Sequence, residues 1–371
     1  MMIKKRAWHP SVTTQFPVCT IPYHMDTYRG CPYNCVYCFA RDFTTFARRN
    51  SEIKEFTYLE ANNPDSFRRW VSRVLEADIN LDKAEQVAFK ERMPLKIGAT
   101  SDPFPYIERH EHITYEFLKI LDEIDYPVQM STKNPEVLHS YSSEFVNPNW
   151  IVSVSIITID EDLQKILEPS AISPARRFAA IKALSAEGKN VLVRIQPTIY
   201  PNIMSELPEM VKLIYESGAK GFLMEGLKMR VTMPAKEQAL FAKIGDAMNY
   251  YIRGWYKENG EINGSDWEIP VAMKMEYIEL ATKLAKQYGL NFYCADNVNR
   301  KCGDSAECCG TEYLRDYKIY AGTFRNKLFD NTNQGNHCVH FPNCAVNFTR
   351  SKTMKGMTIE EATKSKLNKM K

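Results

Sequence analysis

Residues 29 to 41 read RGCPYNCVYCFAR, and this stretch decides how the whole chain is interpreted. Its three cysteines, Cys31, Cys35 and Cys38, follow the spacing C-x3-C-x2-C with no fourth cysteine beside them. Four thiolates close a structural zinc site, so three of them indicate a metal centre that keeps one position open. A [4Fe–4S] cluster fits this pattern, because three thiolates hold three of its irons and leave the fourth open to a small molecule.

A zinc site is the alternative explanation for the same cysteines. Cys35 and Cys38 would supply half of its ligands, and Cys19 or His24 would complete it. This arrangement leaves Cys31 without a role, and it does not predict the strands and helices that follow. The iron–sulfur interpretation is therefore preferred.

The bulk composition is that of an ordinary globular protein. The chain has 371 residues, of which 44% are hydrophobic and 25% charged, and its net charge is +3. The basic start, MMIKKRAWHP, lacks the apolar run of a signal peptide, and the longest apolar stretch, WIVSVSII, is too short to span a bilayer. We expect a cytoplasmic protein without membrane contact. Nine of its ten cysteines lie in two clusters, which indicates metal binding rather than disulfides.

Short β-branched runs alternate with amphipathic helical patterns through the middle of the chain. Strands are expected at PLKIGAT, YPVQMST, WIVSVSIIT, NVLVRIQPTI and KGFLMEG, and a helix that begins at Ser173 and ends near Gly188 is one of those between them. Such repetition produces parallel strands joined by right-handed crossovers. An α/β fold with a barrel of the TIM type, complete or partial, fits this count, and no glycine-rich phosphate loop follows any predicted strand.

The pattern changes after residue 230. Long helices are expected at residues 234–260 and 271–289, followed by a last strand at LNFYCAD and a loop-rich segment with cysteines. We expect a core barrel domain at residues 15–230 and a C-terminal helical, cysteine-rich extension at residues 231–371.

Four stretches of the chain resemble the spore photoproduct lyase family of the radical S-adenosylmethionine (SAM) superfamily. They are YRGCPYNCVYCFAR, IGATSDPFPYIERHEHIT, VQMSTKNPEVL and the run from VSVSIITIDEDLQ to NVLVRIQP, all within residues 23–227. The resemblance implies a (β/α)6 partial barrel, one [4Fe–4S] cluster on the three cysteines, and S-adenosyl-L-methionine chelated at the open iron. In this family an electron from the cluster cleaves SAM, and the resulting 5′-deoxyadenosyl radical takes a hydrogen atom from the substrate.

The same resemblance places four residues where the family contacts SAM, namely Tyr37, Ser101, Lys133 and Ser155. The last three end or follow predicted strands, so we expect them at the mouth of the barrel. A lysine ammonium can pair with the SAM carboxylate, and hydroxyls can bond its amino acid part or its ribose. Two further candidates to reach the mouth are Glu168, before Pro169, and Arg194, inside a predicted strand. Arg194 is a candidate to meet a carboxylate or phosphate there, because a charge on a barrel strand needs a partner.

Two positions depart from the family pattern. The lyase carries a cysteine two residues before the serine of its TSD stretch, where this chain has Ala99. The lyase also has a tyrosine directly after the third cluster cysteine, where this chain has Phe39. Neither side chain can return a hydrogen atom to a product radical. The sequence therefore predicts a relative of the lyase that acts on another substrate, and not the repair enzyme of spores.

Six cysteines near the C-terminus form a second group: Cys294, Cys302, Cys308, Cys309, Cys338 and Cys344. We expect them to hold an auxiliary iron–sulfur cluster, or zinc with His337 or His340; buried cysteines without a metal are the remaining alternative. Side chains of adjacent residues diverge, which leaves one of the pair Cys308 and Cys309 as a candidate reactive thiol.

Two hypotheses about function follow. The first is an enzyme that cleaves SAM with electrons from a donor such as flavodoxin or ferredoxin and abstracts a hydrogen atom. Its expected substrate is a nucleic acid or nucleotide by family analogy, with a peptide side chain or a small metabolite as alternatives. The second is a zinc-dependent nucleic-acid-binding protein. Residues 67–70, FRRW, are candidates for base stacking and phosphate contacts, although a solvated helix face with one packed aromatic gives the same pattern.

Overall fold

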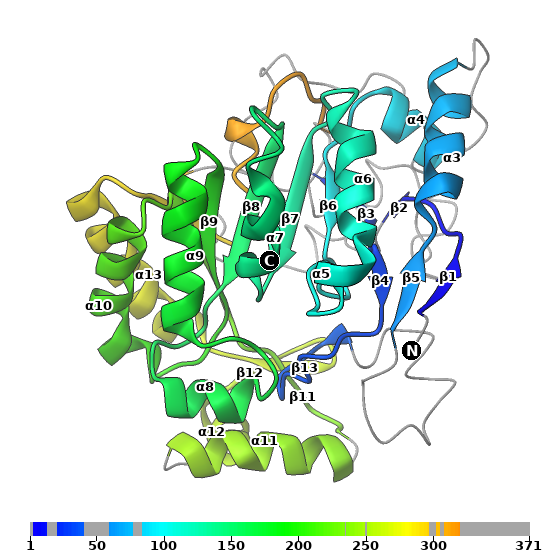
Figure 1. The fold of residues 1–371 in the computed structure, drawn as a ribbon. Helices are drawn as coiled ribbons and strands as arrows, with labels where there is room; N and C mark the ends of the chain where they lie inside the picture. Colours follow the sequence, from blue (N-terminus) through cyan, green and yellow to red (C-terminus); the bar gives the residue numbers. More distant parts are fainter. Residues whose placement is uncertain are drawn as a thin grey trace.

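The computed structural model describes residues 3–12, 21–40, 59–76, 84–233, 235–248, 251–296, 302–304 and 308–319. A central sheet of eight strands dominates this part of the chain, in the order β14-β10-β9-β8-β7-β6-β3-β2 (Figure 1). Seven of these strands are parallel, and β2 pairs antiparallel with β3 at one edge. The strands are β2 (Ser11–Val12), β3 (Tyr23–Met25), β6 (Leu95–Ile97), β7 (Val128–Thr132), β8 (Trp150–Ser155), β9 (Asn190–Thr198), β10 (Gly221–Gly226) and β14 (Asn291–Cys294).

The predicted (β/α)6 partial barrel is confirmed by the six parallel strands from β3 to β10. A seventh strand, β14, comes from the predicted last strand and pairs parallel with β10. This pairing is close, since a Cβ at Gly221 would lie 2.2 Å from the carbonyl oxygen of Asn291. Residues beyond 230 thus contribute a strand to the same sheet.

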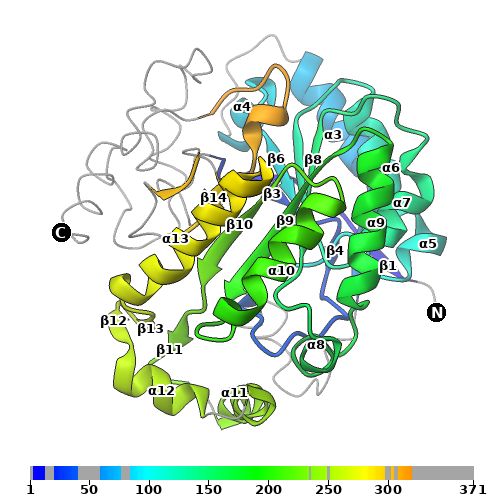
Figure 2. The same cartoon turned by 90° about the vertical axis from the view of Figure 1, so that its left-hand side faces the viewer.

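Helices connect the strands and cover the outer face of the sheet, as Figures 1 and 2 show for α6, α9, α10 and α13. Ser173 caps α9 by accepting a hydrogen bond from the backbone N–H of Arg176 at 3.4 Å, and Pro174 opens the helix, as predicted. The connecting helices are α3 (Pro64–Glu76), α4 (Ala84–Lys90), α5 (Glu108–Glu111), α6 (Ile113–Asp122), α7 (Pro135–Ser142), α8 (Glu161–Leu167), α9 (Pro174–Ala186), α10 (Ile203–Glu216) and α13 (Val271–Tyr288).

The two faces of the sheet differ because side chains alternate along each strand. Outward residues such as Val152, Val193 and Ile195 join the main apolar core with the helices. Ile151, Leu192 and Leu223, inward residues near the strand starts, form a smaller core with Tyr293, Ala295 and Leu314. Nearer the carboxyl ends the inward positions are polar: Ser153, Ser155, Arg194, Gln196 and Glu225. The inner face is therefore packed at one end and polar at the other.

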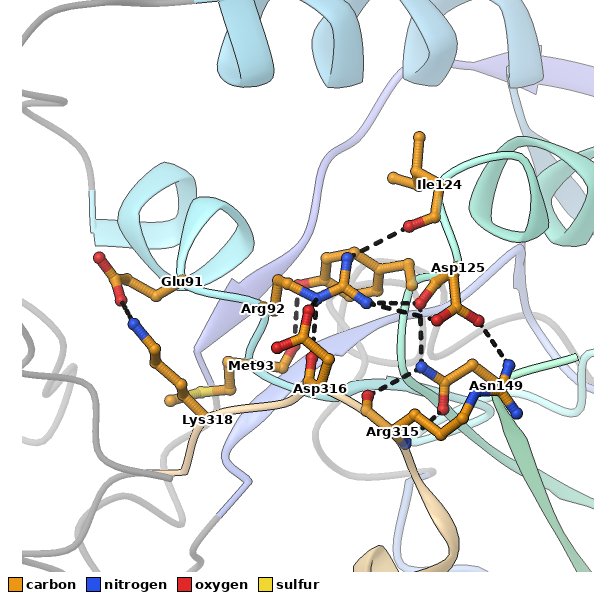
Figure 3. Close-up of polar contacts among 10 residues, drawn as sticks. Glu91, Arg92, Met93, Ile124, Asp125, Asn149, Arg315, Asp316 and Lys318 are labelled. Atoms are coloured by element: carbon orange, nitrogen blue, oxygen red, sulfur yellow. Dashed lines mark hydrogen bonds and ion pairs between the residues drawn. The ribbon is translucent and has the colours of Figure 1, made fainter. Parts of the chain in front are cut away.

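Residues 308–319, which include the short 3-10 helix η2 (Thr311–Tyr313), lie against the amino ends of the strands, at the top of Figure 1. Figure 3 shows how this segment is fixed. Arg315 N–H donates to Asn149 Oδ1 at 2.8 Å, and Asn149 Nδ2 donates to the carbonyl of Arg315 at 2.9 Å. Arg92 pairs with Asp316 at 2.8 Å, and Lys318 Nζ donates to Glu91 at 2.6 Å.

The opposite, carboxyl end of the sheet lies beside α8 and a smaller helical and strand layer (Figure 1). That layer consists of β11 (Met229–Arg230), β12 (Glu261–Asn263), β13 (Asp266–Glu268), α11 (Ala235–Met248) and α12 (Ile252–Asn259). One helix over residues 234–260 was predicted, and this is wrong. Tyr251 precedes α12 with φ −78° and ψ 91°, an extended backbone that cannot continue the hydrogen bonding of α11.

A third sheet, in the order β1-β5-β4, leads into the cysteine loop. It consists of β1 (Lys4–Arg6), β5 (Glu60–Asn62) and β4 (Tyr28–Arg29). Because β4 ends at Arg29, Cys31 follows two residues later, directly beyond a strand that is paired with β5.

The aromatic residues of the FRRW stretch are not available to nucleic acid. Phe67 and Trp70 are only 0% and 4% exposed, and they stack on each other with ring centroids 5.9 Å apart. The proposed base stacking is therefore wrong for both, because the apolar stripe of α3 faces the core. Arg68 and Arg69 do lie on the surface. Within the described ranges, no helix is long and apolar enough to cross a membrane.

Candidate functional site

The three cysteines of the opening motif lie on the loop after β4. Gly30 and Asn34 adopt positive φ values of 83° and 50°, which turn the chain sharply between the cysteines. Cys35 is buried, whereas Cys31 and Cys38 are partly exposed. Burial raises the pKa of the Cys31 thiol to about 12, and burial also raises the pKa of Cys35, with further increases from Cys31 and Cys38.

These mutual effects mean that the three thiols lie within electrostatic range of one another. Neutral thiols in such surroundings lose their protons when a metal binds, because the thiolate is the ligand. Three sulfur donors on one loop fit three corners of an iron–sulfur cluster. Among the described residues, no three His, Cys, Asp or Glu side chains are arranged to hold a single metal ion.

Two neighbouring loops brace the cysteine loop. The hydroxyl of Ser101, after β6, donates to the carbonyl of Gly30, and Tyr33 OH donates to the carbonyl of Phe104 at 2.8 Å. On the other side, the backbone N–H of Val36 donates to the carbonyl of Leu167, at the end of α8, at 2.9 Å. The thiols are therefore held at the carboxyl end of the parallel strands, where barrels of this kind carry their active sites.

A buried carboxylate, Glu168, joins this loop to two strand ends. Its side chain is fully buried, accepts a hydrogen bond from Tyr37 OH, and pairs with Arg177 at 2.5 Å and with Lys133 at 3.9 Å. Burial alone would raise the pKa of Glu168, but Arg177 and Lys133 outweigh it and lower the pKa below its ordinary value. Arg177 also donates to the carbonyl of Ser155 at 2.8 Å.

A second buried carboxylate, Asp102, ties the loop after β6 to the loop after β7. It accepts hydrogen bonds from Thr132 Oγ1 and from the backbone N–H of Lys133, both at 2.7 Å, and from the N–H of Phe104 at 2.9 Å. Asp26, after β3, holds the N–H of Ala99 at 2.8 Å in the same way. Carboxylates thus fix the backbone at three adjacent strand ends.

The four residues expected to contact SAM all lie at this end. Lys133 directly follows β7 and Ser155 ends β8, as predicted, while Ser101 follows β6 by four residues. The structure brings two of them together, since Lys133 Nζ lies 5.7 Å from the centre of the Tyr37 ring. Ser155 is linked to this pair through Arg177. Their roles toward SAM remain predictions.

The sequence indicated Glu168 as a residue at the mouth of the barrel, but its pairing with Arg177 is the part of the site that sequence reasoning missed. Arg177 is fully buried on the core-facing side of α9, between Pro174 and Ile181. A charged residue within an apolar helical stripe was the available signal, because such a residue needs a buried partner.

The structure also places the two residues that depart from the family pattern. Phe39 is 59% exposed, and the backbone N–H of Ala99 donates to Asp26.

The second cysteine group divides between two places. Cys294 ends β14 within the main core, and Cys302 Sγ lies 4.0 Å from Met275 Sδ on α13. Cys308 and Cys309 belong to the segment at the amino end of the sheet, with their sulfurs 3.9 Å apart. The other candidate ligands lie outside the described residues: Cys338, Cys344, His337 and His340, as does Cys19.

Comparisons with known proteins agree with this architecture. The sequence model of the radical SAM superfamily matches residues 25–214. Uncharacterised proteins of Mycobacterium tuberculosis and Mycobacterium bovis are each 24% identical over 219 residues, which cover 56% of this chain and 59% of the relative. The chain thus spans less than two thirds of the length of these curated relatives.

Solved structures of spore photoproduct lyase share the fold. One variant is 14% identical with a TM-score of 0.53, and the match covers 76% of this chain and 78% of the lyase. A second variant, bound to AdoMet and a dinucleoside spore photoproduct, is 16% identical with the same TM-score and coverage. Fold and site together define a radical SAM protein with a partial α/β barrel. The chain belongs to the radical SAM superfamily, a superfamily of enzymes, and its fold is that of the lyase.

Proposed function

We propose that this protein cleaves SAM reductively at a [4Fe–4S] cluster held by Cys31, Cys35 and Cys38, and that it abstracts a hydrogen atom from a nucleic acid or nucleotide. One observation carries the proposal. Three thiols, with no fourth cysteine beside them in the sequence, lie on a single loop at the carboxyl end of a parallel barrel, braced by the loop after β6 and by the end of α8. When bound, the cluster supplies the electron that cleaves the sulfonium of SAM and so generates the 5′-deoxyadenosyl radical.

The chain's own residues would bind and orient SAM. Lys133 is held loosely by Glu168, at 3.9 Å, because the shorter contact of Glu168 is to Arg177. Its ammonium is therefore available for the SAM carboxylate. Tyr37 is fixed by its hydrogen bond to Glu168, and its ring lies below the same ammonium. Ser101 and Ser155 place hydroxyls at the neighbouring strand ends.

The substrate is expected to differ from that of spore photoproduct lyase. Ala99 and Phe39 offer neither a thiol nor a phenol, so these positions cannot return hydrogen to a substrate radical. A nucleic acid or nucleotide remains the proposed substrate class by analogy with the fold neighbours, and a peptide or small metabolite is the alternative. The proposed setting is the cytoplasm, where flavodoxin or ferredoxin supplies electrons. An auxiliary iron–sulfur cluster or zinc on the second cysteine group stays part of the proposal.

The test is anaerobic reconstitution with iron and sulfide. We expect brown protein, an electron paramagnetic resonance signal after reduction with dithionite that changes when SAM is added, and release of 5′-deoxyadenosine. Replacing Cys31, Cys35 and Cys38 together by alanine should remove the signal and reduce product to the level without enzyme. Colourless wild-type protein with stoichiometric zinc, or product from the triple variant, would contradict the proposal.

A double variant at the second cysteine group provides the matched control. Cys302→Ala with Cys308→Ala leaves the loop after β4 intact, so SAM cleavage and the SAM-dependent signal should persist. Iron per chain falls if these thiols hold an auxiliary cluster. Unchanged iron content in the control would remove the auxiliary cluster from the proposal without affecting the first site.

A further inference from the structure

Arg194 lies on the inner face of the sheet at the level of the candidate SAM site. Its neighbours Val193 and Ile195 belong to the outer core, so alternation turns Arg194 inward. It stands in register with Ser155, the last residue of β8. The guanidinium is partly exposed, and its Nη1 donates to Ser131 Oγ at 3.2 Å. Among the described residues, this charged group donates its side-chain hydrogen bond to a neutral hydroxyl.

The carboxylate on the neighbouring strand does not neutralise Arg194. Glu225 of β10 pairs with Lys228 Nζ at 2.8 Å and accepts a hydrogen bond from Gln196 Nε2. Among the described residues, no ion pair joins a carboxylate to Arg194. A partly buried guanidinium has five N–H donors, and leaving most of them without an anionic acceptor is unfavourable.

Other carboxylates at this end of the sheet are also engaged. Asp26 and Asp102 bind backbone N–H groups, and Glu168 binds Arg177 and Tyr37. Asp296, after β14, pairs with Lys274 at 2.9 Å. The carboxylates of the site therefore already have partners within the protein. Two cations, Lys133 and Arg194, can still bind an anionic ligand.

The two cations, Lys133 and Arg194, match the two anionic groups of the proposed reaction, namely the SAM carboxylate and an oxyanion of the substrate. Lys133 lies over Tyr37 in the cysteine loop, which suits the SAM carboxylate. Arg194 lies on β9, and its side chain reaches past β8 to Ser131 of β7, two residues before Lys133. We propose that Arg194 anchors an oxyanion of the substrate, namely a phosphodiester of a nucleotide chain; this rests on the proposed function. The planar guanidinium matches two phosphate oxygens at once, which a lysine does not.

The test measures how tightly a short fluorescein-labelled oligothymidylate binds the anaerobically reconstituted protein in the presence of SAM. Fluorescence anisotropy reports the bound fraction. Arg194→Gln should weaken binding about 10- to 100-fold, as expected for a lost charge-assisted hydrogen bond. The same oligomer with neutral methylphosphonate linkages should bind wild type and variant equally. Arg194→Lys should bind the oligomer more tightly than Arg194→Gln but less tightly than wild type. Lysine keeps the positive charge but cannot donate two parallel hydrogen bonds to one phosphate.

Arg69→Gln is the matched control, since Arg69 is exposed on α3 and its loss changes the net charge equally. A basic groove of about 580 Å³ lined by Arg68, Arg69, Ser72 and Arg73 lies there. If Arg69→Gln weakens oligothymidylate binding and Arg194→Gln does not, the nucleic acid binds at α3 and the assignment of Arg194 is wrong.

Two further outcomes are decisive. Equilibrium dialysis should show the same SAM affinity for wild type and Arg194→Gln; an equal loss of SAM and oligomer affinity would assign Arg194 to SAM instead. Formation of 5′-deoxyadenosine without any binding of oligothymidylate would overturn the nucleotide assignment while the radical chemistry stands. Absence of 5′-deoxyadenosine in wild type would instead count against the proposed function, and the binding comparison would still report on Arg194.

Discussion

The two ends of the central sheet are built on different principles. At the amino end, Ile151, Leu192 and Leu223 pack against Leu314, and the segment that carries Leu314 is bonded to the strand starts. At the carboxyl end, the inner face carries hydroxyls and charges, and three thiols lie on a braced loop. Apolar packing at the amino end stabilises the fold, and the carboxyl end presents polar groups that can take part in chemistry.

The two ends of the sheet also differ in the partners that their buried polar side chains bind. Asn149 at the amino end is 1% exposed, and its amide bonds only backbone groups and so holds chain segments together. Glu168 at the carboxyl end is equally buried but bonds the side chains of Tyr37, Lys133 and Arg177. Substitutions at these two positions should therefore separate stability from ligand binding.

The largest effect is expected for Glu168→Gln. Removing this carboxylate leaves Arg177 charged in a fully buried position, which should reduce the free energy of unfolding by about 3–5 kcal/mol. Urea denaturation of the metal-free protein measures this change. Weaker SAM binding should accompany it, because Tyr37 and Lys133 lose their common partner.

The double variant Glu168→Gln with Arg177→Met tests whether the hub also positions SAM-binding groups. Replacing both charges removes the unpaired ion, so most of the lost stability should return. SAM affinity, measured by equilibrium dialysis, should stay low. Recovery of both quantities would show that the hub is purely structural.

A smaller loss, about 2 kcal/mol, is expected for Asn149→Ala at the amino end. The substitution leaves the backbone N–H of Arg315 and two backbone carbonyls without their partner in three partly buried hydrogen bonds. SAM affinity and iron content should not change, since the site lies at the other end of the strands. Asn147→Ala, which removes only an exposed contact to Arg315, is the control and should have little effect. Loss of SAM binding in Asn149→Ala would contradict the prediction that the amino end contributes to stability and not to ligand binding.

The smallest effect is expected on the outside of the barrel, for Arg68→Ala. Arg68 and Glu123 form an exposed ion pair, so the loss should be about 0.5 kcal/mol in the free energy of unfolding. The hydrogen bond from Arg68 lowers the pKa of Glu123 below 4.5, its value in the unfolded chain. The contribution is therefore present above pH 4.5 and is lost as the pH falls through the folded value. A difference between wild type and variant that grows toward low pH would contradict this account.

Much of the core fold followed from local sequence pattern. The strands from β6 to β10 were expected from short β-branched runs, and the start of α9 from Ser173 and Pro174. These signals are local, because side-chain alternation and capping depend on residues a few positions apart. The single helix predicted over residues 234–260 failed because Tyr251 leaves the helical backbone conformation, which helical periodicity alone does not reveal.

Contacts between distant segments were beyond such reasoning. Glu168 and Arg177 were not recognised as a hub, since Tyr37 lies 131 residues from Glu168 in the sequence. The clamp between Asn149 and Arg315 joins residues 166 positions apart. The sequence left open whether the aromatic residues of the FRRW stretch contact nucleic acid or pack inside. Both rings face the core, and burial depends on the elements packed against α3.

The sequence by itself determined the three-cysteine motif and the parallel strand–helix order, since spacing and periodicity are local properties. Tertiary structure alone decided which charges meet. It paired Glu168 with Arg177, engaged Glu225 with Lys228, and left Arg194 facing a neutral hydroxyl. Ion pairs depend on distance in space, and only the folded chain sets that distance.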